Sequence, residues 1–360
     1  MSRLHFPALL LPLLAACPAP TPPLETRQLA PPADTVIAPF AGEVTDAAWL
    51  EGDRWVVISP QDRAVQVVDF GTHALSPFPP RARQELDQPF HLFRSGDTIF
   101  VADWQRRRLT GWTLSGQPAG VLPAVDRFRG ALPRARDAAG RWYFELRPPP
   151  GPDGAGNRDS AAIVRTGLGG VDDTVARLAP FDLAEVLSEG RRRLERRLLS
   201  GQDRWGVRPD GAVWVARVSG NQVEWRSDSG VVQAGRQLPD RVLPVTENDR
   251  DLFLSRFDAG LRPTVAQIPF AAIKPPFEGA TLAPDGELWL TKSRAVGDSL
   301  RYYQVVDGAG ALLREVTHQG LGHVLAISPT DLLVAEPIEH GVRLLRFRLT
   351  PPAPAGAAQP

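Results

Sequence analysis

Short apolar runs, each opened by a turn residue, recur along most of the chain. Six of them share one pattern: GDRWVVIS from Gly52, GDTIFVAD from Gly96, GRWYFEL from Gly140, GAVWVAR from Gly211, GELWLTK from Gly286 and TDLLVAE from Thr330. The intervals between consecutive anchors are 44, 44, 71, 75 and 44 residues. Similarity at a fixed period is typical of repeat architectures, so the three equal intervals predict one structural repeat.

Each repeat contains four short apolar stretches in the same order. In the second repeat these are PFHLFR, TIFVAD, RLTGWTL and AGVLPA, separated by Gly, Asp, Ser and Pro residues. Alternating apolar runs with such punctuation predict antiparallel hairpins. Four strands in roughly 44 residues are typical of one propeller blade. The pattern therefore predicts an all-β, six-bladed β-propeller of four-stranded antiparallel blades over residues 35–350.

The sixth repeat ends at Leu349, after its third strand. A candidate for the missing fourth strand lies at the other end of the chain, where TVIAPF over Thr35–Phe40 ends like ARLAPF of the third repeat. A blade completed in this way leaves no open sheet edge. We therefore predict that an N-terminal strand closes the ring.

Two intervals are longer than the others and predict two short helical inserts. The first, FDLAEVLSEGRRRLERRLLSG, has Asp182 as a candidate N-cap and Gly201 as a candidate stop. The second, TENDRDLFLSRFDAGL, predicts a helix capped at Thr246 or Asn248. Both inserts follow the outermost strand of a repeat, so we expect both over one face of the disc.

The N-terminus has the features of an export signal. MSRLHF carries one positive charge and precedes the apolar run PALLLPLLAA, which is too short to span a bilayer. Residues 1–16 are therefore interpreted as a signal peptide. Residues 17–34 are rich in proline and predict a tether, and residues 351–360 predict a disordered tail.

The segment Leu14-Ala15-Ala16-Cys17 resembles the lipobox of bacterial lipoproteins. The resemblance implies lipid on Cys17, the membrane as a partner, and an extracytoplasmic location on the bacterial envelope, at the outer membrane or facing the periplasm. The alternative is an ordinary signal peptide that contains a cysteine. Cys17 is the only cysteine in the sequence, so no disulfide forms within the chain.

Composition limits the partners. The 41 basic residues balance 41 acidic ones, whereas general polyanion binders carry a clear basic excess. We expect no nucleic-acid partner.

FVADWQRRRLTGWTLSGQPAG resembles an NHL-type repeat, in which a strand and Asp are followed by a polar turn with Arg, a second strand, a turn and Gly. VISPQDRAVQVVDF is a weaker copy. The mature chain is similar to six-bladed propellers of the NHL/TolB-like kind found on bacterial lipoproteins. That resemblance implies an architecture and no single activity, because such propellers include protein-binding platforms, sensor domains, lactonases and lyases.

In a propeller the innermost strand of each blade lines the central channel. On these strands, His91, His323 and Asp46 are weak candidates for catalysis or for holding a metal ion. No spacing motif links the three. The candidate ligand-binding residues are Arg134, Arg136, Arg204 and Trp205. No cofactor is predicted, although a divalent metal in the channel remains open.

Two functions remain. The leading hypothesis is a membrane-anchored binding or scaffold module for a protein, peptide or envelope glycan. The alternative is an extracytoplasmic, metal-dependent hydrolase or lyase with its site in the channel. The sequence contains no G-x-S-x-G elbow and assigns its one cysteine to lipidation, which favours the non-catalytic hypothesis.

Overall fold

The computed structural model describes residues 24–80, 85–166, 170–188 and 190–349. The predicted signal peptide, Cys17 and the C-terminal tail lie outside these ranges. Within them, no helix is long and apolar enough to cross a membrane.

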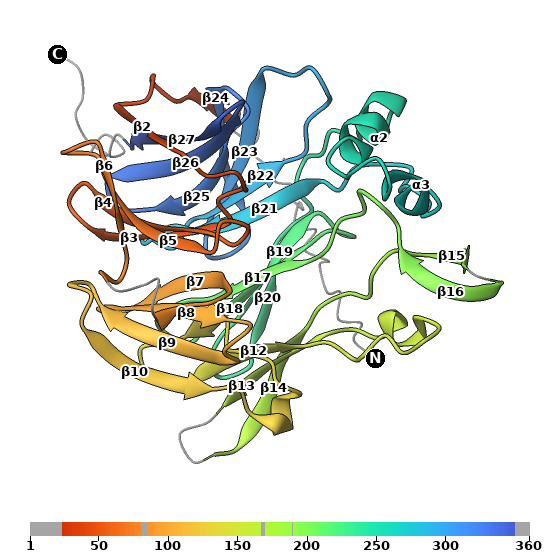
Figure 1. Cartoon of the computed structure of the whole chain (residues 1–360), viewed down its shortest axis with the longest axis horizontal. Coiled ribbons are helices and arrows are strands. Elements are labelled where there is room, and N and C mark those ends of the chain that lie inside the picture. The colour runs from red at the N-terminus through yellow and green to blue at the C-terminus, as the bar shows by residue number, and fades with distance from the viewer. Residues whose placement is uncertain (1–23, 81–84, 167–169, 189, 350–360) are drawn as a thin grey trace, which may run out of the picture.

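Six antiparallel sheets follow one another along the chain and form the blades of a propeller (Figure 1). The first blade is β3 (Asp46–Glu51), β4 (Arg54–Ser59), β5 (Ala64–Asp69) and β6 (Ala74–Pro77). The second is β7 (Pro89–Ser95), β8 (Thr98–Asp103), β9 (Arg108–Thr113) and β10 (Pro118–Pro123). The third is β11 (Ala135–Arg136), β12 (Trp142–Leu146), β13 (Ala162–Thr166) and β14 (Asp172–Arg177).

The remaining blades have the same order of strands. The fourth is β17 (Arg204–Val207), β18 (Val213–Arg217), β19 (Gln222–Arg226) and β20 (Val232–Ala234). The fifth contains β21 (Phe277–Leu282), β22 (Leu288–Lys292), β23 (Leu300–Val306) and β24 (Leu312–Gln319). The sixth contains β25 (His323–Ile327), β26 (Asp331–Ile338) and β27 (Gly341–Arg348). The predicted six-bladed, all-β fold is confirmed.

An N-terminal strand completes the sixth blade, as predicted. Strand β2 (Asp34–Ala38) pairs antiparallel with β27, with Asp34 opposite Arg346 and Ala38 opposite Val342. Figure 1 shows this junction as the red β2 beside the dark blue β27. The buried Arg346 guanidinium also forms ion pairs with Asp34 and with Asp53 of the first blade. Closure therefore joins the two ends of the sequence through backbone and side chains.

Part of the segment that was predicted to be a tether, residues 17–34, forms a strand. Strand β1 (Glu25–Gln28) adds to the outer edge of the fifth blade, parallel to β24, and the next residue, Leu29, is buried in the core between the fifth and sixth blades. Three of the four side chains of β1 are exposed, which is consistent with its polar sequence ETRQ. A short edge strand of this kind lacks the apolar alternation by which strands are predicted.

The prediction of a helix in the first insert is wrong. Residues 183–196 form a hairpin of β15 (Leu183–Ser188) and β16 (Arg191–Arg196). Ala184 and Val186 are buried, whereas Glu185 and Leu187 are exposed, which is the two-residue period of a strand. Gly190 lies in the turn with a φ of 75°. Glycine adopts this left-handed conformation readily, which allows the chain to turn between β15 and β16.

The predicted helix in the second insert is confirmed. Helix α2 (Glu247–Leu254) is capped by Thr246, whose hydroxyl accepts from the backbone of Asp249, while the Asp249 carboxylate accepts from the backbone of Thr246. The short α3 (Arg262–Val265) follows in the same insert. The 3-10 turn η1 (Asp126–Phe128) lies between β10 of the second blade and β11 of the third. The 3-10 turn η2 (Ala155–Arg158) lies between β12 and β13 of the third blade.

The core lies between neighbouring blades. Trp55 packs with residues of the first and sixth blades, Trp112 with the first and second, and Trp289 with the fifth and sixth. These three tryptophans therefore pack between blades, whereas Trp104 is mostly exposed. Aromatic side chains bury large areas, so they suit an interface that recurs around the ring.

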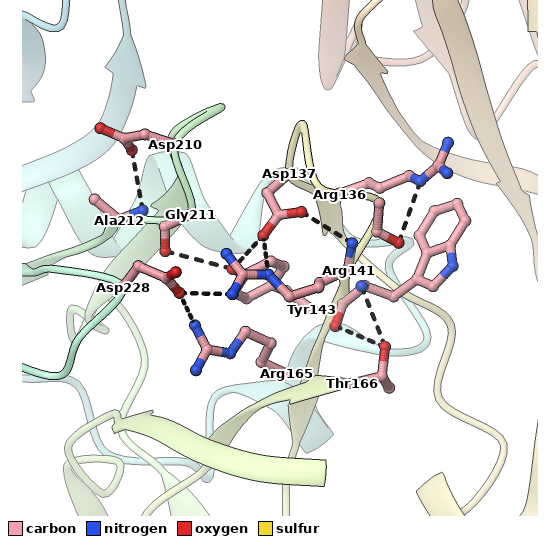
Figure 2. A network of polar contacts seen from close by, with 12 residues as sticks. Arg136, Asp137, Arg141, Tyr143, Arg165, Thr166, Asp210, Gly211, Ala212 and Asp228 are labelled. Carbon is pink, nitrogen blue, oxygen red and sulfur yellow. Dashed lines mark hydrogen bonds and ion pairs between the residues drawn. The ribbon is translucent and has the colours of Figure 1, made fainter. Parts of the chain in front are cut away.

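A polar network joins the third and fourth blades (Figure 2). The Arg141 guanidinium lies between Asp137 at 2.6 Å and Asp228 at 2.7 Å, and Asp228 also pairs with Arg165. The Tyr143 hydroxyl donates to Asp137 at 2.9 Å. Burial, with this hydrogen bond, raises the pKa of Tyr143 well above its ordinary value, so the phenol remains a donor. We interpret the network as structural.

Candidate functional site

The innermost strands β3, β7, β11, β17, β21 and β25 contact one another in a closed ring. This ring carries or adjoins all of the channel residues that the sequence singled out. Asp46 lies on β3, His91 on β7, Arg136 on β11, Arg204 and Trp205 on β17, and His323 on β25, with Arg134 directly before β11. The propeller topology therefore brings to one axis residues that are far apart in the sequence.

Two of the three candidate catalytic residues meet. His91 Nδ1 lies 3.3 Å from Asp46 Oδ2, and His91 Nε2 lies 3.2 Å from the carbonyl oxygen of Arg134. Both ring nitrogens thus face oxygen acceptors of the protein. The imidazole is therefore held between the third blade and the Asp46 carboxylate of the first blade.

His323 does not join that pair. Burial lowers its pKa below the ordinary value, and the charge of Arg301 acts in the same direction. The imidazole is therefore neutral at pH 7. The described residues contain no group of three or more His, Cys, Asp or Glu side chains placed to hold a metal ion.

Glu145 organises the ligand-binding candidates on the third and fourth blades. Its carboxylate accepts from Trp205 Nε1 at 2.7 Å and pairs with Arg134 at 3.2 Å and Arg147 at 2.7 Å. Burial alone would raise the pKa of Glu145, but the Trp205 hydrogen bond and the two arginines outweigh it and hold the pKa below its ordinary value. The sequence analysis missed Glu145, although a carboxylate within the apolar run WYFEL is an unusual strand residue.

Arg204 connects this cluster to the fifth blade. Its Nη2 donates to the carbonyl oxygen of Glu278 at 2.7 Å, and the Glu278 carboxylate accepts from Arg301 at 2.9 Å. Arg204 is exposed to solvent, although neighbouring groups remove part of the water around its guanidinium. This environment lowers the pKa of Arg204, and repulsion from Arg134 lowers it further.

Arg136 lies apart from the other candidates. Its guanidinium stacks over the ring of Trp142 at 4.9 Å, and its Nε donates to the carbonyl oxygen of Gly140. The structure therefore groups Arg134, Arg204 and Trp205 but gives Arg136 a packing role.

The two inserts meet beside the channel. Leu198 forms a parallel bridge with Phe270, and its backbone N–H donates to the carbonyl oxygen of Pro269 at 3.0 Å. Figure 1 shows β15 and β16 on the same side of the molecule as α2 and α3. A cavity of about 390 Å³ lies between the inserts and the inner strands β17 and β21. The sequence analysis did not identify it, because its lining residues are spread from Arg196 to Arg301.

The cavity is strongly basic. Six of its lining side chains are cationic: Arg196, Arg204, Arg256, Lys274, Arg294 and Arg301. Its two carboxylates, Asp249 and Glu278, already pair with Lys274 and Arg301. Burial lowers the pKa of Arg196 and of Arg294, and repulsion from the neighbouring arginines adds to the effect. The positive charge in the cavity therefore exceeds what its own carboxylates neutralise.

No protein-family model and no curated protein matches the chain. Among solved structures, the chain is similar to a member of the DUF4221 family from Bacteroides vulgatus, with 9% identity, 88% of this chain and 96% of that chain covered, and a TM-score of 0.47. It is also similar to a gluconolactonase from Xanthomonas campestris, with 14% identity, 89% and 97% covered, and a TM-score of 0.45. A third similar structure is virginiamycin B lyase from Staphylococcus aureus, with 11% identity, 88% and 99% covered, and a TM-score of 0.43. Similarities at this level concern the course of the chain and say nothing about its activity.

Proposed function

We propose that the protein is a membrane-anchored, extracytoplasmic binding module whose ligand docks where the two inserts meet the channel. The ligand is a component of the cell envelope: a protein, a peptide or a glycan. The observation that carries this proposal is the cavity of about 390 Å³ between both inserts and the inner strands of the fourth and fifth blades. Its volume falls in the range of ligand pockets, which are concave and combine apolar walls with a few polar groups.

The polar groups deeper in the channel support binding over catalysis. Both nitrogens of His91 are engaged by Asp46 and by the Arg134 carbonyl, and Glu145 accepts from Trp205 and two arginines. Contacts of this kind hold the strands of the channel wall together and leave fewer polar groups there for a ligand. The cavity, by contrast, presents arginines that have no carboxylate partner among the residues that the structure describes.

Site-specific crosslinking tests the binding site. A photoreactive phenylalanine analogue at Leu252, which is 49% exposed on α2 and lines the cavity, should crosslink to a discrete envelope component in intact cells. The matched control carries the analogue at Val121, which is 58% exposed on the outer strand of the second blade, and should give no such product. Equal products from both positions, or none from Leu252, would refute the proposed site.

Fractionation of the same cells tests the anchor. The proposed lipid on Cys17 predicts that the Cys17→Ser protein leaves the membrane fraction or accumulates uncleaved. Membrane attachment that survives this substitution would contradict the lipoprotein assignment.

A hydrolase or lyase remains the second candidate. The pair of His91 and Asp46 in the channel, at 3.3 Å, is the observation that favours it, because a carboxylate commonly orients a catalytic imidazole. Turnover of the crosslinked component by the purified protein, abolished by His91→Gln, would establish catalysis. Turnover that His91→Gln leaves unchanged would exclude His91 as the catalytic group, and no turnover would leave binding as the function.

A further inference from the structure

Three arginines of the cavity have no carboxylate partner among the described residues. Arg204 donates only to the carbonyl oxygen of Glu278, and Arg294 donates to the carbonyl oxygen of Asp298 at 2.9 Å. The exposed Arg256 side chain makes no hydrogen bond or ion pair within the part of the chain that the structure describes. The three come from different places: strand β17, the end of α2 and the segment after β22. Their guanidinium groups are available to a ligand.

Ser293 provides an independent observation. It lines the same cavity, is only 8% exposed, and its buried hydroxyl has no hydrogen-bond partner in the described ranges. Leaving a buried hydroxyl unpaired is unfavourable, so each such group in a folded protein requires an explanation. Rotation of the Ser293 side chain toward the cavity would let an acceptor oxygen of a ligand satisfy this hydroxyl.

The remaining wall of the cavity is apolar. It is formed by Leu199, Leu252, Phe253, Pro275, Phe277 and Val296. The cavity is therefore suited to a molecule that has an anionic group at one end and an apolar body at the other.

We propose that the cavity binds a phosphate monoester group carried by the envelope ligand, with the phosphate on Arg204, Arg256, Arg294 and Ser293 and the adjoining apolar part of the ligand against Leu252 and Phe253. Guanidinium groups that approach from three elements suit the tetrahedral oxygens of a phosphate better than the single plane of a carboxylate. Burial lowers the pKa of Arg294, repulsion from Arg301 lowers it further, and a dianion beside the guanidinium would oppose both effects. This inference rests on the proposed binding function, because it names the ligand class of the same site.

Calorimetric titration of the full mature chain in detergent tests the inference. The probes are phenyl phosphate, inorganic phosphate and benzoate. We expect phenyl phosphate to bind most tightly, inorganic phosphate more weakly and benzoate weakest, because only the first has both the dianion and the apolar body. Equal affinity for phenyl phosphate and inorganic phosphate would overturn the organic part of the assignment. Equal affinity for benzoate would overturn the phosphate.

Variants identify the site. Arg256→Gln should weaken phenyl phosphate binding about tenfold or more, since it removes a charge-assisted hydrogen bond, and Ser293→Ala should weaken it less. The matched control is Arg191→Gln, which removes an exposed arginine from β16 of the first insert and should leave affinity unchanged. Unfolding curves should coincide for wild type, Arg256→Gln and the control, because neither arginine contributes to the core.

Two results would overturn the inference: no binding of either phosphate, or phosphate binding that both cavity variants leave intact. The proposed binding function is judged separately. A crosslink at Leu252 that persists without phosphate affinity would reject the ligand class and retain the binding site.

Discussion

At the scale of single residues, His318 shows how burial fixes a protonation state. It lies between the fifth and sixth blades, stacked on Tyr303 with ring centroids 5.8 Å apart. Nδ1 lies 2.9 Å from the carbonyl oxygen of Gln319, which can only accept, so Nδ1 carries the proton. Nε2, 3.1 Å from the Tyr303 hydroxyl, then accepts a hydrogen bond. Burial lowers the pKa of His318 below its ordinary value of 6.5 and keeps the ring neutral.

This histidine predicts a pH-dependent stability. Below pH 6.5 the unfolded chain binds a proton at His318, whereas the folded chain, in which the pKa of His318 is lower, does not. The free energy of unfolding should therefore fall as the pH drops below 6.5. His318→Gln should cost about 1–3 kcal/mol at pH 7.5 through imperfect hydrogen bonds, and should reduce the further loss on going to pH 5.5. Denaturant unfolding at both pH values measures the effect, with the exposed His340→Gln as control. If His318→Gln retains the full wild-type pH dependence, His318 is not its source.

At the scale of elements, the hairpin of the first insert is attached at two adjacent points. The backbone N–H of Arg197 donates to the carbonyl oxygen of Asp182 at 2.9 Å, so the residues that flank the hairpin already lie together. Along its length, the Leu194 N–H donates to the carbonyl oxygen of Asp153 beside η2. The hairpin is therefore an appendage of the disc rather than part of a blade.

Replacing residues 183–196 with a Gly-Gly link tests this attachment. We expect the propeller to unfold in one cooperative transition with a Tm only a few degrees lower, because closing a short loop between adjacent ends costs little. Calorimetry measures the transition. A broad or lost transition would mean that Ala184 and Val186 belong to the main core.

At the scale of the whole molecule, stability depends on closure of the ring. Strand β2 covers the edge of β27, and Arg346, buried beneath it, is neutralised by Asp34 and Asp53. Removing β2 would expose a long apolar edge and leave the buried guanidinium without one partner. Breaking a buried ion pair typically costs about 3–5 kcal/mol.

A series of three N-terminal truncations tests the closure. A chain that begins at Glu25 should match the stability of the mature protein. One that begins at Asp34 should lose roughly 1.5–3 kcal/mol, since β1 and the buried side chain of Leu29 are removed. One that begins at Gly42 should aggregate or fail to fold, because the blade edge is open. Thermal unfolding and gel filtration distinguish these outcomes, and a stable monomer beginning at Gly42 would show that β2 is dispensable.

The sequence by itself determined the blades and their closure. Turn glycines, alternating apolar strands and the 44-residue period are local signals, and TVIAPF matched the missing strand because it has the ending of a fourth strand. The capping box at Thr246 was equally local. The turns, strands and cap each depend on residues within one hairpin or one helical turn. The period and the closing strand follow from comparing such segments along the chain, so pattern alone is sufficient.

Only the tertiary structure decided the rest. The leucines of the first insert fit a helix as well as a strand, and packing of Ala184 and Val186 selected the hairpin. Strand β1 is polar and exists because the edge of β24 offers it backbone partners. The sequence located the candidate channel residues on or beside the innermost strands, but it did not single out Glu145, Ser293 or the cationic cavity. The burial and the electrostatic environment of these residues are set by all of their neighbours. Those neighbours are brought together only by closure of the ring and by the contact of Leu198 with Phe270.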